Sequence, residues 1–249
     1  MNRFARPLAA AFAGLAGLAA APAQAGDWGG IFSAVTYVSD YRYQGVSSTD
    51  LRPALQGYVH WQRADGMFAG VFTSQVHYYD GGPKLEVDAY AGKHFELDGG
   101  RTEITPETLY STFPDNHTPG PTFDFLELKL EARRRQGPLT LLGTTAFTPQ
   151  ASYGGGETWL AEGEADFALS PRLTLKAMAG RRWGHRGVDR TYWSVGAALG
   201  FGKTLAGPRY LVEVKYQGTD LDRIQCGFNP RICSPALVGS LTMALPPIL

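Results

Sequence analysis

The sequence lacks the features that define two common protein classes. Beyond residue 25, no stretch approaches the run of about 18 apolar residues that forms a transmembrane helix. The 23 Lys and Arg side chains are matched by 23 Asp and Glu side chains, so there is no basic excess to attract a nucleic acid. A helical membrane protein is therefore excluded, and no nucleic-acid partner is expected.

The first 25 residues have the pattern of a cleaved export signal. Arg3 and Arg6 are followed by an apolar stretch from Leu8 to Ala21, and Ala23-Gln24-Ala25 gives the small-x-small cleavage pattern. The alternative is a short membrane anchor, but 14 apolar residues are fewer than the roughly 20 that span a bilayer. We therefore predict cleavage before Gly26. The remaining chain, 26–249, forms one domain with a formal charge of −2, because the leader removes two Arg and no acidic residue.

The remaining chain is rich in residues that favour strands and turns, with 31 Gly and 12% aromatic residues. Short turn signals lie at 64–66, 98–100, 136–138, 170–171 and 205–208, and longer irregular stretches at 40–51, 80–83, 114–122, 150–156, 184–190 and 221–235. The segments between them predict twelve strands, at 28–39, 52–63, 67–79, 84–97, 101–113, 123–135, 139–149, 157–169, 172–183, 191–203, 209–220 and 236–245. Because short and long connections alternate, all the short ones lie at one end, as in an up-and-down antiparallel outer-membrane β-barrel.

Side-chain alternation supports this all-β fold class. In 123–135, Leu126, Leu128 and Leu130 alternate with charged residues, and 52–63, 157–169 and 209–220 alternate in the same way. A soluble barrel or sandwich would alternate too. The two differ in their aromatic residues, which a membrane barrel places in two belts near its rims. The predicted outward faces place Trp61, Phe68, Phe95, Phe167, Phe201 and Tyr210 at the short-turn ends, and Tyr78, Trp159, Trp183 and Trp193 at the long-loop ends.

A few positions fit this pattern poorly. Lys93 and Arg181 fall on the predicted lipid face, where a cation is tolerated only near a strand end. The strands 28–39 and 101–113 alternate weakly, and Pro106 interrupts the second. The sequence ends on Ile248-Leu249, although barrels of this kind usually finish on the aromatic residue that the insertion machinery reads.

Two cysteines, Cys226 and Cys233, lie seven positions apart near the C-terminus. In an oxidising exported compartment, this spacing favours a disulfide that closes a short loop. The intervening residues offer none of the usual metal ligands, so we expect no metal and no cofactor at this loop.

The most distinctive stretch is Ser39-Asp40-Tyr41-Arg42-Tyr43-Gln44-Gly45, followed by 53–57. It resembles the opening of the proteobacterial TorF-like porin family, a group otherwise described as conserved hypothetical outer-membrane barrels. Phe113-Pro114, 125–128, 173–180 and 218–221 match in order. The resemblance implies an outer-membrane location, lipid around the barrel, and export and barrel-insertion machinery as partners.

The predicted inner face would carry the function. It bears the charged residues Glu86, Asp88, Glu127, Lys129, Glu131, Arg133, Glu162, Glu164, Asp166, Lys176, Arg182, Glu213 and Lys215. Rings of charge select the solutes that enter a pore, so a channel for passive diffusion of small hydrophilic solutes is one hypothesis. The other is that these charges pair across strands and fill a non-conducting barrel that works through its outer loops. Arg42 either folds inward as a constriction or ties down the first loop.

An enzyme is not expected, because the five His are scattered and no nucleophile and base can be paired. His60 and His94 fall on the predicted inner face near the short-turn rim. Two lumenal polar residues are a better interpretation than a metal pair.

Overall fold

The computed structural model describes residues 29–78, 82–117, 122–184, 189–202, 209–222, 224–226 and 229–248. The predicted export signal, 1–25, lies outside the described residues, as does the short connection 205–208. Cleavage before Gly26 therefore stays a prediction.

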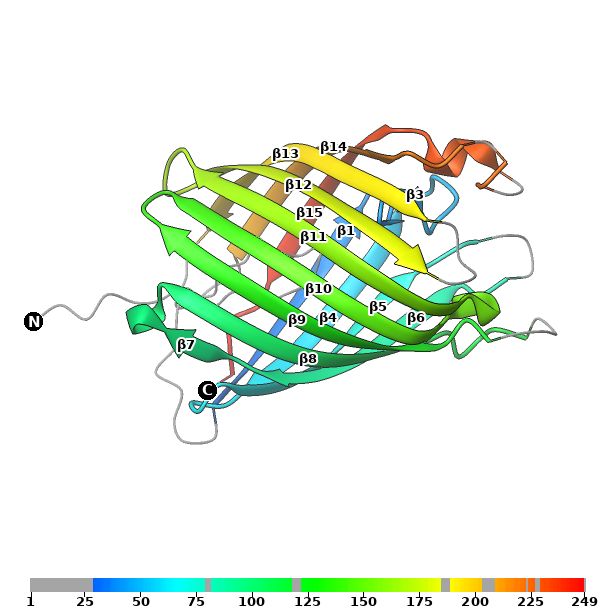
Figure 1. The fold of residues 1–249 in the computed structure, drawn as a ribbon. Helices are drawn as coiled ribbons and strands as arrows, with labels where there is room; N and C mark the ends of the chain where they lie inside the picture. Colours follow the sequence, from blue (N-terminus) through cyan, green and yellow to red (C-terminus); the bar gives the residue numbers. More distant parts are fainter. Residues whose placement is uncertain are drawn as a thin grey trace, which may run out of the picture.

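The chain forms a closed barrel of twelve antiparallel strands (Figure 1). Its wall consists of β1 (Gly30–Val38), β4 (Ala54–Gln62), β5 (Met67–Gln75), β6 (Leu85–Lys93) with β7 (Phe95–Leu97), β8 (Thr102–Thr112), β9 (Phe125–Gln136), β10 (Leu139–Ala151), β11 (Gly156–Ala168), β12 (Leu173–Gly184), β13 (Arg190–Gly202), β14 (Arg209–Thr219) and β15 (Ala236–Ala244). Each strand pairs with the next along the chain, and β1 pairs with β15 to close the barrel. The predicted twelve strands and their order are confirmed.

Smaller elements lie outside the wall. The first loop, residues 39–53 between β1 and β4, contains a hairpin of β2 (Arg42–Tyr43) and β3 (Val46–Ser47). Three short 3-10 turns follow: η1 (Asp98–Gly100), η2 (Ser152–Gly154) and η3 (Pro230–Cys233). The described residues contain no helix long and apolar enough to cross a membrane. In Figure 1 the β9–β10 turn lies at one end of the barrel, and η2 and η3 lie at the other.

β6 and β7 form one barrel strand with a break in its hydrogen bonding. Gly92 pairs with Glu107 and Phe95 pairs with Ile104, so the register is continuous and brings Lys93 opposite Pro106. Proline has no N–H to donate to the ladder, which explains the break at this point. β8, the strand that contains Pro106, nevertheless alternates regularly, with Glu103, Thr105 and Glu107 buried. Pro106 therefore interrupts the ladder and not the strand.

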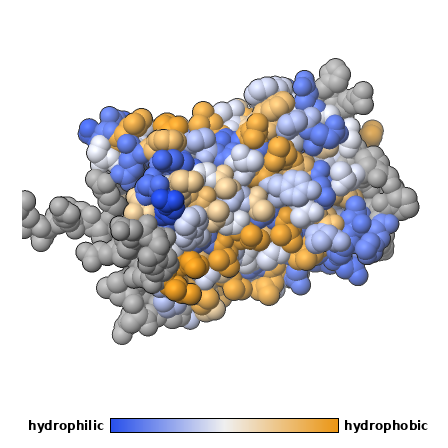
Figure 2. Space-filling model, turned by 90° about the horizontal axis from the view of Figure 1, so that it is seen from below, coloured by the Kyte–Doolittle hydropathy of each residue, from blue (hydrophilic) through white to orange (hydrophobic). Residues whose placement is uncertain are grey.

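The two faces of the wall differ as the alternation predicts. On β9, Leu126, Leu128 and Leu130 are 40–46% exposed on the outside, whereas Glu127 and Glu131 are buried inside. In Figure 2, hydrophobic residues run along the barrel wall and hydrophilic residues gather toward its ends. Lys93 and Arg181 lie near strand ends on the outer face: Lys93 lies over the Phe95 ring, and Arg181 pairs with Asp189 at 3.4 Å.

The predicted outward orientation is wrong for two of the belt aromatic residues, Phe68 and Tyr78. Phe68 is buried inside the barrel against Tyr90 and Leu109, and Tyr78 packs inside against Phe113 and Phe123. β5 carries apolar side chains on both faces, with Val71 outside and Phe72 inside, so hydrophobicity alone does not fix its register. Six other belt residues are at least 36% exposed: Trp61, Phe95, Trp159, Phe167, Trp183 and Phe201. The remaining two, Trp193 and Tyr210, are half-buried.

The C-terminal residues extend the ladder past β15. Leu245 N donates to Ser33 O at 2.9 Å, and Ile248 exchanges two backbone hydrogen bonds with Ile31. Because these bonds involve backbone atoms only, the aliphatic side chains here are compatible with closure of the barrel.

Candidate functional site: a charged lumen behind the first loop

The predicted pore-lining charges lie on the inner face of the wall. Seven are buried: Glu86, Asp88, Glu127, Glu131, Arg133, Lys176 and Glu213. Nine line a central cavity of about 180 Å³, namely Glu86, Asp88, Glu127, Lys129, Glu131, Glu162, Glu164, Lys176 and Lys215. Arg182 lines a second cavity, nearer the long loops. Arg133, Asp166 and Glu213 line neither of these two cavities.

Several of these charges form ion pairs, some across neighbouring strands and some along one strand. Lys176 contacts Glu164 at 2.7 Å and Asp166 at 3.1 Å, and Lys215 contacts Glu213 at 3.4 Å. Arg133 bridges Glu131 at 2.8 Å and Glu103 at 2.7 Å, while Lys129 contacts Glu107 at 2.7 Å. Glu103 and Glu107 were missed in the sequence because Pro106 obscured the alternation of their strand. The lumen therefore combines ion pairs with a cavity whose lining includes charges of both signs.

The first loop folds into the barrel and is held there by Asp40. The Asp40 carboxylate accepts hydrogen bonds from Arg42 Nε at 2.6 Å, Ser47 Oγ at 2.5 Å and Thr49 Oγ1 at 3.1 Å. Arg42 also donates from Nη1 to the carbonyls of Gly45, at 3.0 Å, and Ser234, at 2.8 Å. The Arg42 side chain is 0% exposed. Its guanidinium therefore ties the loop to itself and to the last loop, between β14 and β15.

Gly45 allows the loop to approach the wall closely. Its φ is +80°, a conformation that favours glycine, and a Cβ here would lie 2.4 Å from the Gly218 carbonyl oxygen on β14. The motif residues Asp40, Arg42 and Gly45 thus have structural roles in one compact loop, and Tyr41 packs against Val38, Ala54 and Val238. Ser39 Oγ accepts a hydrogen bond from Gly239 N at 3.0 Å.

The tip of the loop reaches strands three and four places around the wall from β1. Tyr43 Oη accepts a hydrogen bond from Arg182 Nη1 at 3.0 Å, and Gln44 Oε1 accepts one from Arg190 Nε at 3.0 Å. Burial raises the pKa of the Tyr43 phenol to about 12, so it is neutral at physiological pH. The loop starts at β1, yet these contacts are with β12 and β13, so it extends over part of the lumen.

Two cavities meet at this tip. The central cavity and the outer cavity, of about 350 Å³, share Tyr43, Glu86 and Phe125 in their linings. The outer cavity is also lined by Ser152, Gly155 and Leu221, from the long connections. The first loop therefore separates an outer vestibule from a central chamber.

Aromatic rings fill part of the lumen near the short-turn end. Phe68 stacks on His60, with ring centroids 5.3 Å apart, and on His94, at 4.5 Å. His60 Nδ1 lies 3.2 Å from Tyr90 Oη, and His94 Nδ1 lies 2.9 Å from Thr105 Oγ1. Both imidazoles are thus packed against a phenyl ring. No cluster of three or more His, Cys, Asp or Glu residues in the described part of the chain could hold a metal ion.

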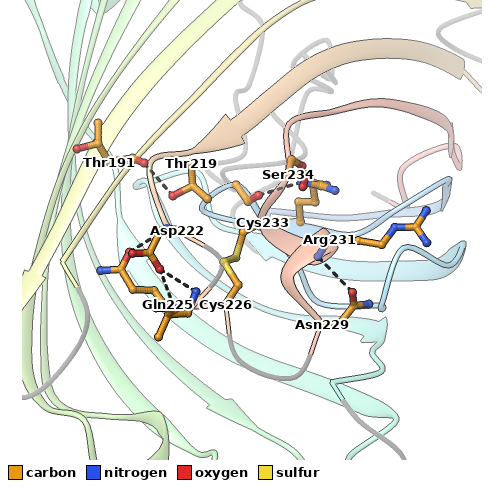
Figure 3. Close-up of a disulfide and its surroundings, with 12 residues drawn as sticks. Thr191, Thr219, Asp222, Gln225, Cys226, Asn229, Arg231, Cys233 and Ser234 are labelled. Atoms are coloured by element: carbon orange, nitrogen blue, oxygen red, sulfur yellow. Dashed lines mark hydrogen bonds between the residues drawn. A yellow bond between two sulfur atoms is a disulfide. The ribbon is translucent and has the colours of Figure 1, made fainter.

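The cysteines form the predicted disulfide. Cys226 and Cys233 are bonded and close a loop in which Asn229 Oδ1 accepts a hydrogen bond from Arg231 N (Figure 3). Asn229 also donates to Asp50 of the first loop. Ser234, next to Cys233, accepts the bond from Arg42. The disulfide loop thus supports the first loop from the outside.

A family model described as "Bacterial protein of unknown function (Gcw_chp)" matches residues 24–232. The chain belongs to this family. No curated protein matches the chain.

Several solved structures share the fold. A KdgM porin is 8% identical, with a TM-score of 0.55 over 86% of this chain and 98% of that one. A structure from work on in-meso crystallization of membrane proteins is 13% identical, with a TM-score of 0.51 over 87% of this chain and 83% of that one. Salmonella typhi OmpF in complex with daunomycin is 10% identical, with a TM-score of 0.45 over 89% of this chain and 98% of that one. At such identities the likeness concerns the fold alone: the chain shares the closed antiparallel β-barrel of the KdgM porin.

Proposed function

We propose that the mature chain, from Gly26, is an outer-membrane channel for passive diffusion of small hydrophilic solutes. The observation that carries this proposal is the pair of cavities inside the barrel, which meet at the tip of the first loop. Solutes enter the outer vestibule, pass the loop tip and cross the charged central chamber. The TorF-like resemblance of residues 39–45 and the porin-like fold support the same proposal.

The first loop is the constriction of this channel. Tyr43 and Gln44 extend from the loop to β12 and β13, and so narrow the passage from within. Arg42 acts indirectly, because its guanidinium fixes the loop through Asp40 and the Gly45 and Ser234 carbonyls. Ion pairs such as Lys176 with Glu164 and Asp166 leave both signs of charge facing the chamber, which sets the preference among solutes.

The rival function is a non-conducting barrel that binds partners through its outer loops. The rings of Phe68, His60 and His94 favour this alternative, since they fill part of the lumen near the short-turn end. Cross-strand ion pairs also occupy space in a barrel of intermediate size.

Liposome swelling separates the two functions. Liposomes that carry the folded mature protein should swell in small sugars and not in large oligosaccharides. A variant with residues 41–49 replaced by a short Gly-Ser linker should swell faster, because the constriction is removed. If neither protein causes swelling although both show heat-modifiable gel mobility, the barrel does not conduct solutes and the rival function is correct.

A further inference from the structure

Two arginines face each other inside the outer vestibule. Arg182 on β12 is the direct cross-strand partner of Arg190 on β13, and both line the outer cavity. Side chains directly opposite on antiparallel strands lie about 4.5–5.5 Å apart at Cβ, and like charges there destabilise a sheet. The arrangement therefore carries an electrostatic cost that needs a physical explanation.

Neither arginine is neutralised by a carboxylate in the described part of the chain. Arg182 donates to Tyr43 Oη at 3.0 Å and to Thr158 Oγ1 at 2.7 Å, and Arg190 donates to Gln44 Oε1. These acceptors are uncharged, since burial raises the pKa of Tyr43 to about 12. Other lumenal cations, such as Lys129 and Lys176, each contact a carboxylate.

Glu86, the acidic residue in the lining of the outer cavity, lies far from the two arginines around the barrel wall. Glu86 projects from β6, which lies about half-way around the closed ring of strands from β12 and β13. The vestibule therefore carries two adjacent positive charges on one side. Each guanidinium has five N–H donors, of which the contacts above use only some. Arg182 and Arg190 are half-buried, so the cavity reaches them.

We propose that Arg182 and Arg190 together form a binding site for a small oxyanion, either a carboxylate or a phosphate group of a solute entering from outside. A planar guanidinium fork matches both groups by paired, charge-assisted hydrogen bonds. The ligand is a dissolved anion and not a lipid headgroup, because both side chains face the lumen, whereas the lipid-facing neighbour Arg181 pairs with Asp189. The site goes beyond the proposed channel, since an anion can be held here without passing the first loop.

The test uses inorganic phosphate as the probe and the full mature protein folded in detergent. Broadening of the phosphorus NMR signal of phosphate, at constant ionic strength in chloride, reports binding. The variant R182Q/R190Q should weaken binding by about tenfold or more, since each arginine supplies a charged hydrogen bond. R181Q is the matched control, because it removes a neighbouring arginine of the same strand from the outer face, and it should bind phosphate as the parent does.

A second measurement guards against a variant that misfolds. Phosphate should raise the melting temperature of the parent protein, and this gain should be absent in the single variant R190Q, which removes one of the two opposed like charges and keeps the barrel intact. The proposal is overturned if the parent protein binds no phosphate, or if R190Q and R182Q/R190Q bind it as tightly as the parent. Phosphate binding without conductance would contradict the channel only, and conductance without phosphate binding would contradict this site only.

Discussion

Arg42 and Asp40 form a buried ion pair, in which Arg42 Nε donates to Asp40 Oδ2 at 2.6 Å. The Asp40 carboxylate also joins the two arms of the first loop, through Ser47 and Thr49. An aspartate two residues before an arginine thus determines how the loop closes inside the barrel.

Asp40→Ala should release the first loop. Removal of one partner leaves the Arg42 charge buried and unpaired, at a cost of about 3–5 kcal/mol to the folded loop. We expect cleavage of the loop by added protease and a larger single-channel conductance, with little change in barrel melting. Asp65→Ala is the control, because its pair with Arg63 is exposed in a short turn. Unchanged protease resistance and conductance in Asp40→Ala would show that the ion pair does not hold the loop.

Gly45→Ala should displace the same loop by steric contact. The added Cβ meets the Gly218 carbonyl oxygen at 2.4 Å, and the positive φ adds about 1–2 kcal/mol of backbone strain. Gly137→Ala is a matched control, because that φ is also positive, +59°, but no atom lies within 4 Å of the added Cβ. Protease sensitivity of the loop should rise in the first variant alone. Equal effects in both variants would assign the change to backbone strain and not to contact with β14.

Lys176→Gln should shift ion selectivity toward cations. Lys176 neutralises Glu164 and Asp166, and its removal leaves the Glu164 carboxylate uncompensated in the lining of the central chamber. The reversal potential in a salt gradient measures the shift. Lys93→Gln removes a cation from the outer face and should leave the reversal potential unchanged. A shift of the same size in both variants would mean that the chamber charges do not control selectivity.

Loss of the disulfide should loosen the loops and leave the barrel folded. A cross-link that closes a loop of this length contributes about 2–3 kcal/mol by chain entropy. The paired variant Cys226→Ser/Cys233→Ser should therefore become sensitive to protease in the last loop while keeping heat-modifiable mobility. The first loop should also become more accessible, since Ser234 accepts a bond from Arg42. A barrel that fails to fold without the disulfide would contradict this local role.

Much of the barrel could be predicted because its signals are local. The period of two and the alternation of short and long connections identified twelve strands, and β9 shows why: its leucines and charges alternate without exception from Leu126 to Glu131. The strand predicted at 67–79 gave the wrong faces for Phe68 and Tyr78, because apolar residues occupy both sides of β5 within it. In such a strand the register is set by its neighbours, which one sequence does not describe.

The site was less predictable than the fold, since it depends on contacts between distant residues. Asp40 and Arg42 are close in sequence, and their motif stood out. The contact of Tyr43 with Arg182 spans 139 positions, and the pairing of Arg182 with Arg190 depends on the register across a long connection. The sequence therefore identified Arg182 as a lumenal residue but did not reveal Arg190 as its partner.

The recording of single channels in planar bilayers tests the central claim most directly. The folded mature protein should give discrete conductance steps, and these should grow when residues 41–49 are replaced by a short linker. Protein with heat-modifiable mobility that gives no steps in either form would contradict the proposed channel.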